Sequence, residues 1–106
     1  MVCKPQGIKK VTISARDLYR NPIDHTDLTK FNAAIIDPPR AGAEQQVRQL
    51  AQSNLRDIAM VSCNPVTFAR DANILCAGGY GLKWVEAVDQ FRWSPHIEIV
   101  AHFSKV

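Results

Sequence analysis

The sequence lacks the features that define several broad classes of protein. No apolar run approaches the roughly 18 residues of a membrane span, and the first residues have no hydrophobic stretch of the signal-peptide kind. The cysteines Cys3, Cys63 and Cys76 are odd in number and widely spaced, and no Cys-x-x-Cys pair occurs. This pattern argues against a disulfide framework and a zinc ribbon. We therefore expect a reduced, cytoplasmic protein with no metal site.

The composition is that of one small globular domain. The chain has 106 residues, of which 46% are hydrophobic and 22% charged, so bulk disorder is excluded. Thirteen Lys and Arg residues against ten Asp and Glu give a formal net charge of +3. That surplus tolerates a polyanionic partner without requiring one.

Five apolar runs predict strands, at residues 11–14, 31–37, 58–62, 82–91 and 97–103. The second run is apolar almost throughout and stops at two prolines, which predicts a strand buried on both faces, and the third is predicted to be buried as well. The last two runs have no helix between them, so we expect them to be antiparallel neighbours.

Two stretches between these runs have the spacing of a helix face. The first carries its apolar residues at Val47, Leu50, Ala51 and Leu55. The second begins with the cap and first-turn pair Asn64-Pro65, ends at Gly78-Gly79, and has its apolar face at Phe68, Ala72 and Leu75. Alternating strands and helices predict an α/β fold with right-handed crossovers and an antiparallel pair at one edge. In such sheets the chemistry gathers at the carboxyl ends of the strands.

Cys63 is the candidate nucleophile, because it stands between the end of a strand and the start of a helix. The unpaired N–H groups and the positive dipole end of the helix favour a thiolate there. The alternative is that Cys63 is a small buried hydrophobe. Cys76, in mid-helix, and Cys3, near the N-terminus, have no such setting.

Five other charged or titratable residues are candidates, and three of them are given a structural alternative. Glu98, among apolar neighbours, is either a solvent-facing strand residue or a partly desolvated general base. Asp37 and Asp17 follow predicted strands and are either ligand contacts or turn residues. Arg40 offers a planar fork to a phosphate. His96 lies beside Glu98, so a thiol hydrolase with a nucleophile–histidine–acid set is a third possibility.

The sequence has no Gly-x-Gly-x-x-Gly loop after a strand. The glycines of residues 78–81 follow a helix, where capping explains them without a phosphate. A complete nucleotide-binding α/β domain normally carries its glycine loop after the first strand, so this chain has the pattern of one part of such a domain.

Several motifs together resemble the RNA 5-methyluridine methyltransferases, enzymes that use S-adenosylmethionine to methylate uracil in ribosomal or transfer RNA. The motifs occur in the family's order and cover about residues 11–106: Asp37-Pro-Pro-Arg-Ala-Gly42, Val61-Ser-Cys-Asn-Pro-Val-Thr-Phe-Ala-Arg-Asp71, Gly79-Tyr80, Asp89-Gln-Phe91 and Pro95-His-Ile-Glu98.

The resemblance implies a role for each of the main candidates. Cys63 corresponds to the nucleophile that adds to ring carbon 6 of uracil, and Glu98 to the base that removes the proton from ring carbon 5. Asp17 and Asp37 correspond to positions that contact S-adenosylmethionine. RNA is then the substrate, and its target base must be flipped into the pocket.

The resemblance also implies that residues 1–106 are a partial domain. They correspond to the C-terminal portion of a Rossmann-like class I methyltransferase sheet, without its first two strands and glycine-rich cofactor loop. We expect weak or no cofactor binding and activity from this chain alone. A truncated, inactive α/β module with an interaction role is the alternative. The run at 11–14 has lost its usual neighbours, so we expect an unpaired sheet edge that favours a homo-oligomer.

Overall fold

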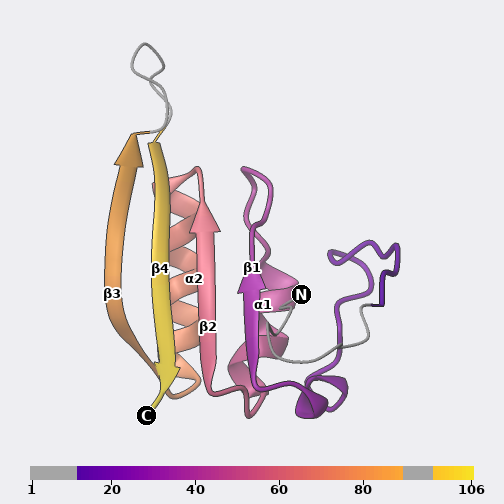
Figure 1. Ribbon diagram of the computed structural model, residues 1–106. Coiled ribbons are helices and arrows are strands. Elements are labelled where there is room, and N and C mark those ends of the chain that lie inside the picture. The colour runs from indigo at the N-terminus through magenta and orange to yellow at the C-terminus, as the bar shows by residue number, and fades with distance from the viewer. Residues whose placement is uncertain (1–11, 90–96) are drawn as a thin grey trace.

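The computed structural model describes residues 12–89 and 97–106, which form a mixed sheet with helices on one face (Figure 1). The four strands are β1 (Ala33–Ile36), β2 (Asp57–Ser62), β3 (Tyr80–Asp89) and β4 (Ile97–Lys105), in the order β1-β2-β4-β3. Strands β1 and β2 are parallel, whereas β4 is antiparallel to both of its neighbours. The predicted α/β fold and the antiparallel last pair are confirmed. Residues 90 and 91 of the predicted fourth strand lie outside the described residues.

Two helices cover the same face of this sheet, as Figure 1 shows. Helix α1 (Glu44–Gln52) connects β1 to β2, and α2 (Pro65–Ala77) connects β2 to β3. A short 3-10 helix, η1 (Asp27–Lys30), precedes β1. The core lies between the helices and the sheet and consists of Leu28, Val47, Leu50, Leu55, Ile58, Met60, Leu75, Tyr80, Ala101 and Phe103.

The ends of α2 follow the local sequence signals. The side chain of Asn64 accepts a hydrogen bond from the backbone N–H of Val66 at 3.0 Å, and Pro65 occupies the first turn. Gly79 has a φ of +100°, a left-handed conformation that glycine adopts without strain, and ends the helix. Both predicted caps are confirmed.

The prediction of a strand at residues 11–14 is wrong for Thr12 to Ser14, and Val11 lies outside the described residues. Ile13 is 91% exposed, and no strand of the described residues pairs with this segment. A strand needs a hydrogen-bonded neighbour, and a β-branched run alone does not provide one.

The predicted burial of the second and third strands on both faces is also wrong. Strand β1 lies at an edge of the sheet, where Ile35 is 52% exposed, and β2 alternates buried and half-buried residues. The reason is that the helices cover one face only, so every second residue faces away from them. Leu55 is buried as expected but lies beyond the end of α1.

Candidate active site

The pairing of β2 with β4 brings two of the predicted site residues to adjacent positions. Ser62, the last residue of β2, pairs with Ile99 of β4. Because the two strands are antiparallel, the residue after Ser62 and the residue before Ile99 come next to each other. These residues are Cys63 and Glu98. Both side chains are half-buried. Since Ile99 packs toward the helices, Glu98 faces the open side of the sheet.

Strand β1 brings Asp37 to the same edge. Ile36, the last residue of β1, pairs with Met60 of β2, and Asp37 follows it directly. The carboxyl ends of β1 and β2 and the start of β4 therefore all lie toward the top of the sheet in Figure 1, with β1 ending lower than the other two. Asp37 is exposed, and within the described residues its carboxylate has no hydrogen-bond or ion-pair partner. None of the described residues occupies this acceptor at the rim.

The backbone on either side of Cys63 is held by Ser62, a residue that the sequence did not single out. The Ser62 hydroxyl donates to the carbonyl oxygen of Asn64 at 3.1 Å, and its oxygen accepts the Asn64 N–H at 3.2 Å. Ser62 thus closes a tight turn around the cysteine. A serine at the end of a strand, two residues before a helix cap, was the available signal.

The loop between β1 and α1 rests on the first turn of α2. The Asn64 amide group and the Thr67 hydroxyl both donate to the carbonyl oxygen of Arg40, at 3.1 and 3.2 Å. Arg40 is exposed, and its guanidinium forms no ion pair within the described residues. The backbone of Arg40, and not its side chain, therefore holds the loop.

Asp17 lies in an exposed loop and has local contacts. Its carboxylate accepts the Tyr19 N–H at 3.0 Å and lies 4.0 Å from Arg20. This is the geometry of the loop-forming alternative. The Tyr19 hydroxyl donates to the Gly42 carbonyl oxygen at 2.6 Å, so the loop of Asp17 is docked on the loop that follows Asp37. The ligand role of Asp17 stays a prediction.

The remaining candidate residues lie elsewhere or are not described. His96 and Cys3 lie outside the described residues, so the nucleophile–histidine–acid set is not tested. Cys76 is exposed near the end of α2, far along the helix from Cys63. The described residues contain no group of three or more His, Cys, Asp or Glu side chains that could hold a metal ion. In the same part of the chain, no helix is long and apolar enough to cross a membrane.

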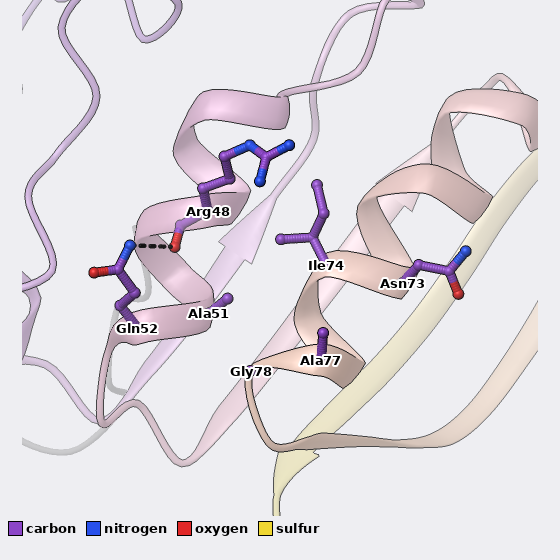
Figure 2. A pocket seen from close by; sticks show the side chains of 7 residues that line it. All are labelled: Arg48, Ala51, Gln52, Asn73, Ile74, Ala77 and Gly78. Carbon is purple, nitrogen blue, oxygen red and sulfur yellow. Dashed lines mark hydrogen bonds between the residues drawn. The ribbon is translucent and has the colours of Figure 1, made fainter.

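A shallow hollow lies between the C-terminal halves of α1 and α2, at the far end of α2 from Cys63 (Figure 2). Figure 2 shows side chains from both helices around it, with a hydrogen bond of 3.4 Å from the Gln52 amide to the Arg48 carbonyl oxygen. It contains none of the candidate residues, so it is not the predicted site. Its lining is Arg48, Ala51, Gln52, Asn73, Ile74, Ala77 and Gly78.

Residues 8–106 match the model of the tRNA (uracil-5-)-methyltransferase family. The chain belongs to this family. The methyltransferase family inferred from the motifs is therefore confirmed.

Similar proteins agree with this assignment. An uncharacterized RNA methyltransferase of Rhizobium meliloti is 53% identical over 100 residues, which cover 94% of this chain and 24% of the relative. The 23S rRNA (uracil(1939)-C(5))-methyltransferase RlmD of Hahella chejuensis is 38% identical over 93% of this chain and 23% of its own length. The chain thus spans about a quarter of the length of the curated relatives it matches.

A solved structure shares the fold. The crystal structure of the Pyrococcus abyssi tRNA (uracil-54, C5)-methyltransferase, in complex with S-adenosyl-L-homocysteine, is 42% identical with a TM-score of 0.60. The likeness covers 69% of this chain and 18% of that one. The sheet and helices described above therefore have the fold of a methyltransferase segment.

Proposed function

We propose that this chain is the C-terminal catalytic part of an enzyme that methylates carbon 5 of uracil in ribosomal or transfer RNA. The observation that carries the proposal is the pairing of β2 with β4, which makes Cys63 and Glu98 neighbours across two strands. The reaction needs a thiolate and a carboxylate at one base, and the family assignment supplies the substrate class.

In this proposal Cys63 activates the uracil ring. Carbon 5 of uracil is a poor nucleophile, because its π electrons are shared with the ring carbonyls. The Cys63 thiolate forms a bond to carbon 6, and the electron pair of the carbon 5–carbon 6 bond moves into an enolate. Carbon 5 of this enolate is nucleophilic enough to accept a methyl group. Cys63 lies just before Asn64, the N-cap residue of α2.

Glu98 completes the reaction as the general base. After methylation carbon 5 still carries its proton, and the ring remains bonded to sulfur. Glu98 takes that proton, the electron pair restores the double bond, and the bond between sulfur and carbon 6 breaks to release the thiolate. The half-buried position of Glu98 on the open face of the sheet suits a base that acts on a bound ring.

The acidic residues at the rim fit part of S-adenosylmethionine. Its ribose hydroxyls and its amino group are hydrogen-bond donors, and the open carboxylate of Asp37 is a matching acceptor. We assign Asp37, with Asp17 in the loop docked beside it, as cofactor contacts. When bound, S-adenosylmethionine would supply an electrophilic sulfonium methyl group, and its sulfur–methyl bond would break to leave S-adenosylhomocysteine, so the reaction requires no metal.

We further propose that residues 1–106 alone bind this cofactor weakly, because the sequence has no glycine-rich loop after a strand. Isothermal titration with S-adenosylmethionine should show no low-micromolar binding to this chain. Low-micromolar affinity would contradict the incomplete site.

The uncovered side of the sheet supports self-association of this chain. Strand β1 is an edge strand with Ile35 exposed, and Trp84 and Val88 of β3 are exposed as well. Exposed apolar strands at an edge favour pairing with another chain. Light scattering should therefore detect a dimer or larger species, and a strict monomer would argue against this proposal.

The test of the reaction uses uridine RNA, S-adenosylmethionine, and two proteins: this chain and a version extended upstream. The extended Glu98→Gln variant should accumulate a covalent protein–RNA adduct, because the ring is methylated but its proton is not removed. Cys63→Ala should form neither adduct nor methylated RNA. Cys76→Ala is the matched control and should behave as the parent protein.

Two outcomes decide against the proposal. Methylation by the Cys63→Ala variant would show that another residue activates the ring. Absence of both adduct and product from the extended parent protein would favour the alternative of an inactive interaction module.

A further inference from the structure

The loop that joins β1 to α1 is held through successive backbone carbonyl groups. Each carbonyl oxygen from Pro39 to Gly42 accepts a hydrogen bond. The Pro39 oxygen is bonded by the Gly42 N–H at 2.8 Å, and the Ala41 oxygen by the Arg70 guanidinium at 3.1 Å. The next N–H along the chain, that of Ala43, donates to Asp71 at 3.1 Å. Helix α2 therefore holds the loop at several successive positions.

Asp71 is the buried centre of these contacts. It is 1% exposed, and both of its carboxylate oxygens are used, one by the Ala43 N–H and the other by Arg70 Nε at 3.0 Å. Burying a carboxylate is costly unless it is paired and hydrogen-bonded, and removing one partner leaves the other uncompensated. The pair thus has one favourable arrangement, and in that arrangement both side chains bond the loop.

Gly42 shows that the loop and the pair are fitted to each other. Its φ is +81°, and a Cβ atom there would lie 2.5 Å from the Arg70 guanidinium and 3.0 Å from the Asp71 carboxylate. The left-handed backbone conformation therefore favours glycine, and a Cβ atom would push the Arg70 guanidinium away from the loop. Any larger residue must displace the guanidinium or the loop.

We propose that Arg70 and Asp71 are positioning residues for the methyl-transfer site. They fix the loop of residues 37–42 against the start of α2, and so hold Asp37 and the turn of Asn64 in place relative to Cys63. This inference rests on the proposed function, since it takes Cys63 as the nucleophile. Neither residue is assigned a contact with RNA or cofactor; both act through the loop.

The test compares the same substitution at two arginines that share one acidic partner. Arg70 and Arg48 both approach Glu44, at 3.8 and 2.6 Å, but only Arg70 bonds the loop. Arg70→Lys keeps the charge and loses the planar fork. Arg48→Lys is the matched control. Asp71→Asn, which keeps the shape of the carboxylate, is the second test variant.

Two readouts separate positioning from a merely structural role. Amide hydrogen exchange of this chain should rise by about tenfold or more for Ala43 in Arg70→Lys, while the amides in the second half of α2 keep their protection. In the extended protein kcat should fall roughly 10- to 100-fold with KM for RNA changed less than about twofold, because small misplacements of reacting groups cost rate. Arg48→Lys should change neither.

Each result has one meaning. Unchanged exchange at Ala43 in both test variants would overturn the fixed loop, whatever the activity. Faster exchange with an unchanged kcat would overturn the catalytic consequence. A parent protein that forms no adduct at Cys63 would instead overturn the proposed function, and the exchange data would still report on the loop.

Discussion

The two ends of α2 are held to the rest of the molecule by different means. At the C-terminal end the contact is close and mainly apolar, with one hydrogen bond from Lys105 to the Gly78 carbonyl oxygen. Leu75 is completely buried, and a Cβ atom on Gly78 would lie 2.5 Å from the carbonyl oxygen of Ala51 in α1. At the N-terminal end the contacts are directional hydrogen bonds from Asn64, Thr67 and Arg70 to successive loop carbonyl oxygens.

This difference indicates that one end of the helix mainly stabilises the fold and the other mainly positions the loop. Apolar packing gains free energy from burial and tolerates small shifts, whereas hydrogen bonds to backbone carbonyls fix positions closely and contribute little net stability. Substitutions at the C-terminal end should therefore lower the free energy of unfolding. Substitutions at the N-terminal end should change the geometry around Cys63 at a smaller cost in stability.

The largest expected effect is at the apolar end. Leu75→Ala leaves a cavity beneath α2 and should lower the free energy of unfolding by about 2–5 kcal/mol, measured by urea denaturation. Cys76→Ala, at the exposed neighbouring position, should change it by less than about 0.5 kcal/mol. A loss below about 1 kcal/mol for Leu75→Ala would show that this end does not carry the stability.

Gly78→Ala should have the next largest effect. The added methyl group would meet both the carbonyl oxygen and the Cβ atom of Ala51, at 2.5 and 2.7 Å, and force the two helices apart. Overpacking of this kind costs about 1–3 kcal/mol, and thermal or urea unfolding measures it. A variant as stable as the parent would mean that the helices separate without cost.

The polar end is tested by a pair of substitutions at Asn64. Asn64→Ala removes both the helix cap and the bond to Arg40, and should cost about 1 kcal/mol. Asn64→Asp keeps the capping oxygen and loses the amide donor, so its stability should stay near that of the parent. Its loop should nevertheless exchange amide hydrogens faster. Equal losses of stability in both variants would contradict the separation of cap and positioning roles.

The smallest effect concerns acid stability on the open face. His102 bonds Asp57 at 2.9 Å, and this hydrogen bond lowers the pKa of Asp57 from its ordinary value of 3.8. A lowered folded-state pKa stabilises the fold above the ordinary value, and the contribution disappears as the pH falls through the folded value. Asp57→Asn should therefore reduce the loss of stability as the pH falls through and below the ordinary pKa of 3.8, measured by urea midpoints. The same loss of stability at low pH in Asp57→Asn and in the parent protein would contradict this role of Asp57.

Local signals in the sequence predicted the local structure. The Asn64-Pro65 pair and Gly79 determine the ends of α2 through their own backbone preferences, which are the same in any fold. The prediction that β1 is buried on both faces was wrong, because burial depends on which faces of the sheet the helices cover. Neither a hydrophobic run nor its length contains that information.

The candidate site is formed by the pairing of β2 with β4, and no local sequence pattern predicts that pairing. Residues 97–103 were expected to pair with the preceding strand, and they do, but β4 also lies against β2, and only this second pairing brings Glu98 beside Cys63. Asp71 was not predicted for a similar reason. A charged residue in mid-helix is normally exposed, and its burial follows from a loop that lies 28 positions away in the sequence.

The central claim is that the thiol of Cys63 attacks carbon 6 of uracil in RNA. RNA with 5-fluorouridine at the target position tests it directly. Carbon 5 then carries fluorine in place of the proton, a base cannot remove fluorine, and the ring stays bonded to the enzyme. With S-adenosylmethionine and the extended protein, mass spectrometry should map the RNA adduct to Cys63, and Cys63→Ala should abolish it while Glu98→Gln retains it. An adduct on Cys76 or Cys3, or one that survives Cys63→Ala, would contradict the account.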